Sequence, residues 1–422
     1  MQYIHVDEFH RSATRALVRS AMPLLPLSVS NSMGNSTMRV FLAGDFEPAR
    51  GVDNVMPKPT RGELREGSCT HAAEYVMLAE RRAGARIDRT HVTARSLIGD
   101  LPSVVRLRRP IAHGIINLET AVTRCDDFAP KAVNYRASEE NVAMLLDELS
   151  MEGINVACIA NNHVFDFGAR GFADTLNAAR RVTEESGGRF VFVGGGRTVR
   201  DATAPVIVGE HNTRAAVFAM AFQNSGTPLS WSADETSSGM GVAMGDYRDR
   251  VPTRTLLEIT RAKASGAMVI VSIHFGSNWG WEIDPENVTA ARALIDAGAD
   301  IVHGHSSHHP RTAELYKNKL ILYGCGEMFN DYEGIGDHPG FPASHFLGDL
   351  RFAYFVDVDT RTGDFVRMFV HPMKQKLFRL HEGESSHAKR FQNALAPQYA
   401  KRGLRVEIDA DDDRSLKVTP IE

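Results

Sequence analysis

Short apolar runs rich in β-branched residues alternate with segments of helical periodicity along most of the chain. The apolar runs predict buried strands at 39–44, 114–119, 154–160, 190–194, 204–208, 215–221, 267–274, 301–303, 319–324 and 352–358. Helical spacing predicts helices at 138–149, 169–181, 253–264 and 287–298. This alternation is typical of an α/β fold, and the late strands indicate an antiparallel contribution.

The pattern covers residues 38–378, which we predict to form one large domain. The apolar run at 21–30 contains two prolines and is shorter than the roughly 20 residues that a membrane-spanning helix needs. We therefore expect residues 1–37 to be a flexible extension or an over-long translation start, with a secretory signal as the weaker alternative. The charged segment 379–422 is expected to be a tail, with a peripheral helix followed by a loose end.

Composition narrows the class of protein. The 422 residues are 43% hydrophobic and 24% charged, values typical of a globular protein with a sizeable core. A net charge of -4 gives no electrostatic basis for binding nucleic acid or an anionic membrane. Four cysteines in a chain of this length do not make a disulfide framework, which favours a reducing cytoplasm. The oligomeric state is not indicated.

Polar side chains gather where the predicted strands end, which in open α/β sheets is the edge that binds ligands. They are Asp45 and Glu47, Glu119, the run Asn161-Asn162-His163, His274, and the histidines of the run 301–310, I-V-H-G-H-S-S-H-H-P. Carboxylate, amide and imidazole groups together suit Zn²⁺, Mn²⁺ or Fe²⁺, and Mg²⁺ is a further candidate. The pattern predicts one or two divalent ions at this edge, with His305 and His308 facing them and His303 structural.

Other residues near the strand ends are candidates for catalysis. His163 and Asp166 have the spacing of an oriented acid/base pair, although Asp166 could instead cap the following helix. Cys325, in a glycine-rich loop after a strand, is a candidate reactive thiol, although a buried inert thiol is the commoner outcome.

A second group of residues is predicted to bind substrate. Arg50 and Arg136 are candidates for contacting substrate carboxylates. Trp279 and Trp281 either line a substrate slot or cover the metal pocket, and His309 faces the substrate or supports a ligand.

Five motifs in order carry a family resemblance: G-D-x-x-x-x-R, N-L-E-T, A-N-N-H-x-x-D-x-G, H-x-G-S-N-W-G and G-H-x-x-H-H-P. This set, within roughly 38–378, resembles the CapA family of capsule and poly-γ-glutamate biosynthesis, which has the calcineurin-like metallophosphoesterase fold. The resemblance implies a four-layer α/β/β/α sandwich and a histidine at 163 that protonates a leaving group. The metal-ligand positions that it implies are Asp45, Glu119, Asn162, His274, His305 and His308.

The motifs depart from the phosphoesterase pattern in three places. The first reads D-x-E where phosphoesterases have D-x-H, so Glu47 would replace an imidazole. The second offers Glu119 in place of an aspartate, and the last reads G-H-S-S-H in place of G-H-x-H. These departures leave open whether both metal sites are filled and whether the metal is needed at all.

Several functions are compatible with these residues. The first is a metal-dependent, hydrolase-like enzyme that performs acid/base chemistry on a peptide-like or glutamyl substrate. The second is a peptide Cα epimerase, which needs acid/base groups on opposite faces of a Cα–H. A phosphoesterase and a non-catalytic assembly factor for poly-γ-glutamate or capsule synthesis are the remaining alternatives.

Overall fold

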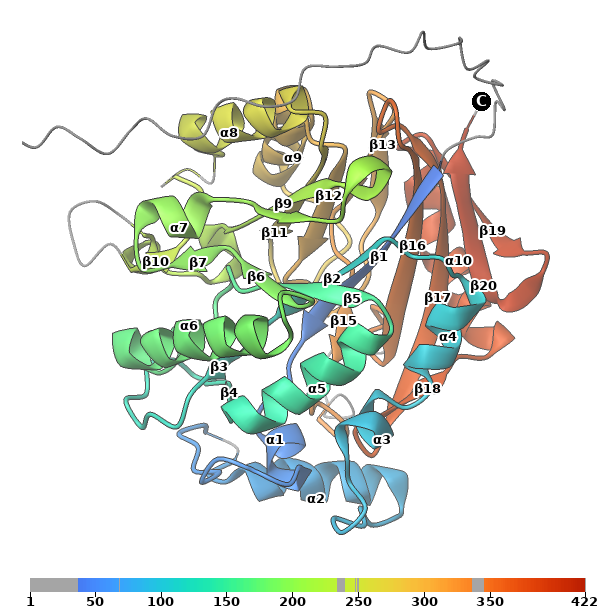
Figure 1. The fold of residues 1–422 in the computed structure, drawn as a ribbon. Coiled ribbons are helices and arrows are strands. Elements are labelled where there is room, and N and C mark those ends of the chain that lie inside the picture. The colour runs from blue at the N-terminus through green and yellow to red at the C-terminus, as the bar shows by residue number, and fades with distance from the viewer. Residues whose placement is uncertain are drawn as a thin grey trace, which may run out of the picture. The chain divides into compact units, whose positions relative to one another are not determined.

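Two β-sheets lie face to face in the computed structural model, which describes residues 37–67, 69–233, 240–246, 248, 250–335 and 345–421 (Figure 1). The larger sheet has the strand order β19-β20-β17-β16-β1-β2-β5-β6, with β15 beside β1 and β18 beside β17. Its strands are β1 Thr37–Phe46, β2 His113–Leu118, β5 Ile154–Cys158, β6 Val191–Val193, β15 Glu327–Phe329, β16 Leu350–Asp359, β17 Phe365–Lys376, β18 Arg379–Glu382, β19 Leu404–Asp409 and β20 Asp412–Pro420.

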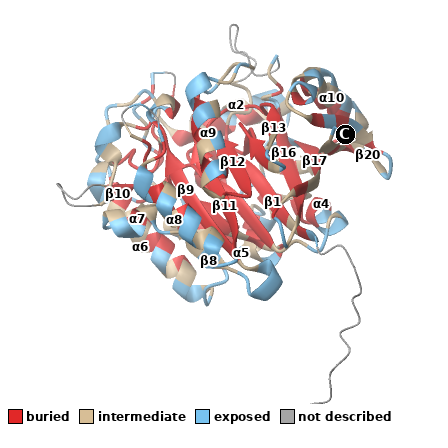
Figure 2. Ribbon diagram, turned by 90° about the horizontal axis from the view of Figure 1, so that it is seen from above, coloured by how far each residue is buried: buried red, intermediate tan, exposed pale blue. Residues whose placement is uncertain are grey.

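The smaller sheet has the order β13-β14-β12-β11-β9-β8. Its strands are β8 Val206–Val208, β9 Ala215–Ala221, β11 Met268–His274, β12 Ile301–His305, β13 Ala313–Tyr316 and β14 Lys319–Leu322. β9, β11, β12 and β14 run parallel, and an antiparallel strand closes each edge. Figure 2 shows that the central strands β1, β11 and β12 are almost wholly buried.

Helices form the two outer layers. α5 (Glu139–Met151) and α6 (Gly168–Glu185) pack against β5 and β6, while α8 (Thr253–Ala264) and α9 (Pro285–Ala297) pack against β11 and β12. Alternate residues of β11 serve the two layers: Ile270 joins the core between the sheets, whereas Val269 and Val271 pack under the helices. This order of layers is the α/β/β/α sandwich that the sequence predicts.

Shorter elements complete the described chain. They are α1 Gly51–Val55, α2 Ala72–Ala83, α3 Ala94–Ile98, α4 Leu101–Leu107, α7 Val199–Thr203, β3 Ala121–Val122, β4 Arg136–Ala137, β7 Gly195–Gly196 and β10 Gly241–Val242. Within the described residues, no helix combines the length and the apolar character needed to cross a bilayer. Except for Thr37, the extension expected at 1–37 lies outside the described residues.

The expectation of a loose end after residue 379 is wrong. The predicted helix is present as α10 (Ser385–Ala400), but β19 and β20 follow it and extend the larger sheet through β17. Leu404, Leu416 and Val418 are fully buried in this addition. The charged residues that suggested a tail alternate with these apolar positions, as expected for strands with one face toward solvent.

A buried histidine in β17 gives a stability prediction. Nε of Arg108 donates to Nε2 of His371 at 2.8 Å, and burial lowers the pKa of His371 to about 3. Below the ordinary pKa of about 6.5, only the unfolded chain takes up this proton, so stability falls as the pH falls from there. Between pH 6.5 and pH 5.0, the unfolding free energy of the wild-type protein should fall by about 2 kcal/mol more than that of His371→Gln. Urea unfolding at both pH values measures this difference, and equal losses in the two proteins would contradict it.

Candidate metal centre

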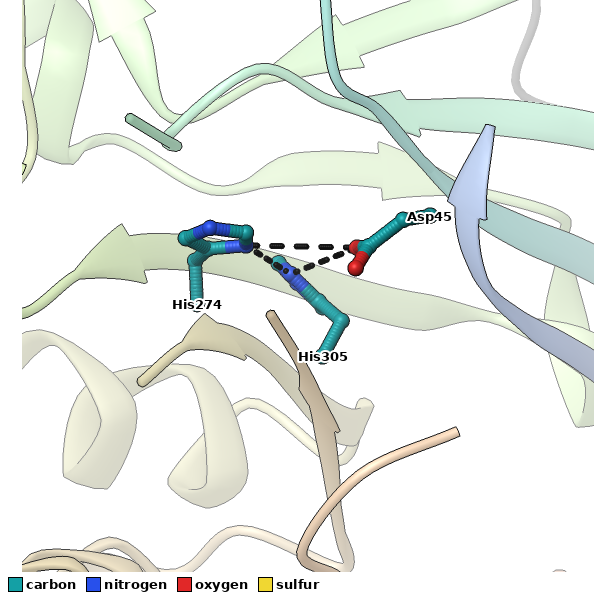
Figure 3. A group of neighbouring side chains, drawn as sticks. All are labelled: Asp45, His274 and His305. Atoms are coloured by element: carbon teal, nitrogen blue, oxygen red, sulfur yellow. Dashed lines mark hydrogen bonds and ion pairs between the residues drawn. The ribbon is translucent and has the colours of Figure 1, made fainter. Parts of the chain in front are cut away.

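The carboxyl ends of the central strands bring together three residues that we call the first metal cluster: Asp45, His274 and His305 (Figure 3). Asp45 ends β1 in the larger sheet, and the histidines end the neighbouring strands β11 and β12 in the smaller sheet. Oδ1 of Asp45 lies 3.7 Å from Nδ1 of His305 and 3.9 Å from Nδ1 of His274. All three side chains are buried, and the two Nδ1 atoms are 2.8 Å apart.

A chain of hydrogen bonds fixes which nitrogen of His305 carries its proton. The carbonyl of Ala43 can only accept, so Nε2 of His303 donates to it, at 2.9 Å. Burial lowers the pKa of His303 to about 4, so its Nδ1 is unprotonated and accepts from the hydroxyl of Ser272. The Ser272 oxygen in turn accepts from Nε2 of His305, at 2.9 Å. Nδ1 of His305 therefore presents a lone pair to the first metal cluster, and His303 has a supporting role.

Three further residues form what we call the second metal cluster: Glu47, His308 and Glu327. Nδ1 of His308 is 2.9 Å from Oε1 of Glu327. Neither oxygen of Glu47 accepts a hydrogen bond among the described residues, and the side chain of Glu327 has only this contact with His308. Buried carboxylates without a donor are costly, and a cation is the partner that this arrangement lacks.

The two clusters are adjacent. β1 pairs with β15 so that Asp45 is the register partner of Glu327. This pairing depends on Gly44, because a Cβ at that position would lie 1.8 Å from the carbonyl oxygen of Gly326. The clusters therefore lie next to each other at one pair of strands.

Acidic groups crowd the space around both clusters. Burial, followed by the charge of Glu327, raises the pKa of Asp45 to about 7 and that of Glu47 well above its ordinary value. Burial, with Asp45 and Glu47 as neighbouring charges, also raises the pKa of Glu119. These four carboxylates could together balance the charge of two divalent ions. The donor set of carboxylates and imidazoles fits Mn²⁺, Fe²⁺ or Zn²⁺.

Glu119 and Asn162 lie beside the first metal cluster. Oε1 of Glu119 is 3.6 Å from Nε2 of His274, and Oδ1 of Asn162 is 3.2 Å from the same nitrogen. Asn117 donates to Asp45 at 2.7 Å and to Glu119 at 3.2 Å, which holds the two carboxylates next to each other. Both residues therefore lie beside His274, and a ligand role for them stays a prediction.

His163 and Asp166 form a direct pair. Nδ1 of His163 is 2.6 Å from Oδ2 of Asp166, and Nε2 of His163 is 3.8 Å from Oε1 of Glu119. Asp166 also accepts from the Lys131 ammonium at 2.6 Å and from the backbone N–H of Tyr135 at 2.7 Å. Asp166 does not cap α6, whose N-cap residue, Phe167, makes no side-chain capping bond. The pair leaves Nε2 of His163 directed toward the metal clusters.

The two arginines predicted to bind substrate are occupied by protein groups. Arg50 pairs with Asp331 and Glu66, and it is buried. Arg136 donates to the carbonyl of Cys125 and to Asp126, and its guanidinium lies 4.7 Å from the ring centre of Phe167. Because these partners take up most of their donors, the structure gives no support to a substrate role for either residue.

An aromatic surface borders the second metal cluster. The Trp279 ring lies 5.6 Å from that of His308 and stacks on His309 at 5.7 Å. Trp281 contacts His309 edge-on at 5.1 Å. Both tryptophans are half-buried, whereas His309 is buried. The tryptophans therefore flank the centre, and substrate contact there stays a prediction.

The surroundings of Cys325 oppose the catalytic role predicted for it. Its side chain is fully buried, and burial raises the pKa of the thiol well above its ordinary value. The thiol form is unreactive toward electrophiles, so a nucleophilic thiolate is not favoured there.

Glu327 is a candidate ligand that was not predicted from the sequence. It stands in the run G-C-G-E after β14, and the chain position alone did not show that β15 would pair with β1. A glycine-flanked glutamate at a strand end was the available signal. Lys131 was also missed, because it is 35 positions from Asp166 in the sequence, with β4, α5 and β5 between them.

Comparisons with known proteins identify the family of this chain. The family model "Bacterial capsule synthesis protein PGA_cap" matches residues 39–332. A Mycobacterium tuberculosis protein named "Probable polyglutamine synthesis accessory protein" is 36% identical over 384 residues, which cover 90% of this chain and 96% of that protein. The capsule biosynthesis protein CapA of Bacillus anthracis is 26% identical over 207 residues, covering 47% of this chain and 46% of CapA.

A solved structure of a novel phosphatase from Mycoplasma pneumoniae can be aligned with this chain at 11% identity and a TM-score of 0.43. The alignment covers 86% of this chain and 100% of the phosphatase chain. That likeness is too distant to carry an argument. The family match spans well over half of the chain, and the mycobacterial relative aligns over nearly its whole length. The chain belongs to the bacterial capsule synthesis protein PGA_cap family.

Proposed function

We propose that this protein is a metal-dependent hydrolase that acts on an amide bond of a glutamyl or peptide-like chain. The observation that carries the proposal is the convergence of the two metal clusters, one with Asp45 beside the free Nδ1 of His305 and the other with the buried carboxylates of Glu47 and Glu327 beside His308. Two divalent ions held there would polarise the reacting carbonyl and make water a stronger nucleophile. The glutamyl class of substrate comes from the resemblance to the capsule and poly-γ-glutamate biosynthesis family, and the name of the mycobacterial relative refers to the related polymer polyglutamine.

The residues around the clusters have separate tasks in this proposal. Asp45 and Glu119, held together by Asn117, supply negative charge at the centre. His163 donates its Nδ1 proton to Asp166, so its Nε2 can take a proton from the attacking water and return it to the leaving amine. Burial lowers the pKa of His163 to about 4, which keeps Nε2 free to accept at neutral pH.

The experiment is an assay with defined substrates. Purified protein loaded with Mn²⁺ or Zn²⁺ is incubated with α- and γ-linked oligoglutamates and with oligoglutamine in ¹⁸O-labelled water, and the products are analysed by mass spectrometry. Cleavage fragments that carry one ¹⁸O at the new carboxylate support the proposal. The metal-free protein should give none.

Other outcomes separate the remaining functions. In D₂O, a gain of one dalton without cleavage would mean Cα exchange and would replace the proposal with epimerisation. Phosphate release from a phosphoester with no amide cleavage would indicate a phosphoesterase. No turnover of any substrate by a fully metal-loaded protein would contradict an enzymatic role and favour an accessory role in assembly.

A further inference from the structure

A buried ion pair joins the segment that follows β1 to the segment that follows β15, next to the two carboxylates of the second metal cluster. Arg50 lies three residues after Glu47, and Asp331 lies four residues after Glu327. Nε of Arg50 donates to Oδ2 of Asp331 at 3.1 Å, and Nη2 donates to Oδ1. The backbone N–H of Gly51 adds a third bond to Asp331 at 2.8 Å. The side chains of Arg50 and Asp331 are 1% and 2% exposed, so solvent does not compete for these bonds.

The same arginine supports the third member of the cluster through aromatic rings. The Arg50 guanidinium lies 5.2 Å from the ring centre of Tyr332 and 4.4 Å from that of Tyr135. Tyr332 stacks on His308, with ring centres 5.5 Å apart and planes 19° apart. Tyr135 stacks on His163 at 3.7 Å. The guanidinium therefore lies behind both a candidate metal ligand and the proposed proton carrier.

The backbone at Arg50 is strained, which shows that its surroundings determine its position. Its φ is 45°, in the left-handed region that non-glycine residues seldom adopt. Such conformations persist where neighbouring contacts over-determine them, and they concentrate at functional sites. At Arg50 those contacts are the bonds to Asp331, the hydroxyl of Tyr75 at 2.9 Å and the carboxylate of Glu66.

We infer that the Arg50–Asp331 pair positions the second metal cluster and sets its affinity for metal, and that the first metal cluster does not depend on it. The pair holds the segment around Glu47 against the segment around Glu327. The Arg50 guanidinium also supports the His308 ring through Tyr332. The first metal cluster has separate support, from Ser272, His303 and Asn117. This inference rests on the proposed function only in that both require the clusters to bind divalent ions. It gives Arg50 a positioning role in place of the predicted contact with substrate.

The test is metal binding to Arg50→Lys, which keeps the charge but loses the two-pronged contact with Asp331. Mn²⁺ titration by equilibrium dialysis, with the bound metal counted by mass spectrometry, should give two sites in the wild-type protein. In the variant, one site should bind roughly 10- to 100-fold more weakly, the usual effect of losing a residue that orients a ligand, while the other is unchanged.

The matched control is Arg39→Lys. Arg39 makes a two-pronged pair with Asp357 at 2.6 and 2.8 Å, at the other end of β1. This variant removes the same kind of contact and should keep both metal sites at wild-type affinity. Equal weakening of both sites in Arg50→Lys, or no weakening of either, overturns the inference.

Two variants of Tyr332 keep the inference testable if Arg50→Lys does not fold. Tyr332→Phe retains the ring over His308 and should bind two ions like the wild-type protein. Tyr332→Leu removes the ring and should weaken the same single site as Arg50→Lys; unchanged binding would overturn the inference. A wild-type protein that binds no metal would instead overturn the proposed function, so the two failures are distinguishable.

Discussion

Replacing Asp45 with asparagine is expected to abolish metal binding at the first metal cluster and to lower kcat/KM by roughly 10³-fold. A bound metal ion contributes several kcal/mol to catalysis, and each 1.4 kcal/mol is about a factor of ten in rate. Asp45 places Oδ1 within 4 Å of both histidine Nδ1 atoms and is also the register partner of Glu327. The neutral amide keeps the side chain's size but removes the charge that attracts the ion.

Thermal unfolding of the metal-free protein separates loss of metal from loss of fold. Burial raises the pKa of Asp45 to about 7, so its charge opposes folding when no metal is bound. Metal-free Asp45→Asn should therefore be at least as stable as the metal-free wild-type protein at pH 8. Wild-type metal content and wild-type activity in this variant would contradict the role assigned to Asp45.

The second large effect is expected for His163→Gln. General acid–base catalysis by a positioned histidine contributes roughly 10²- to 10⁴-fold, so kcat should fall by about that factor. Metal content should stay at the wild-type level, because Nδ1 of His163 is bonded to Asp166 and its Nε2 is 3.8 Å from Glu119. The measurements are steady-state kinetics and metal counting on the same preparation.

His113→Gln is the matched control for this variant. His113 is also buried, has a pKa lowered by burial, and bonds through Nε2 to the carbonyl of Thr213 at 2.6 Å. It lies in β2, at the opposite end from the strand termini that carry the clusters. Its replacement should leave kcat unchanged. A similar loss of kcat in both variants would show a structural effect and would remove His163 from the catalytic scheme.

The α/β class and most of the candidate ligands could be predicted from the sequence because both follow from local pattern, whereas the four-layer sandwich was implied only by the family resemblance. Buried parallel strands appear in the sequence as apolar runs. Their carboxyl ends meet at one edge of the sheet, so Asp45, His274 and His305 could be assigned to one site from the sequence. β19 and β20 were missed because their exposed faces are charged. The many charged residues made the segment resemble a solvated tail, although apolar and polar residues alternate along it as in short strands.

The roles of Glu327 and Arg50 could not be predicted because they depend on contacts between distant segments. Glu327 reaches the centre through pairing of β15 with β1, and Arg50 meets its partner 281 residues away. From the sequence alone, an arginine near a predicted site is equally compatible with a contact to substrate and with one half of a buried ion pair. Only its partner in space separates the two interpretations.

The central claim is that the two metal clusters hold two divalent ions side by side. Electron paramagnetic resonance of the Mn²⁺-loaded wild-type protein, with bound manganese counted in the same sample, tests it most directly. We predict two Mn²⁺ per chain with the spectrum of a magnetically coupled pair, as expected for ions about 4 Å apart. A single uncoupled Mn²⁺ signal, or no bound manganese at any concentration tested, would contradict the account.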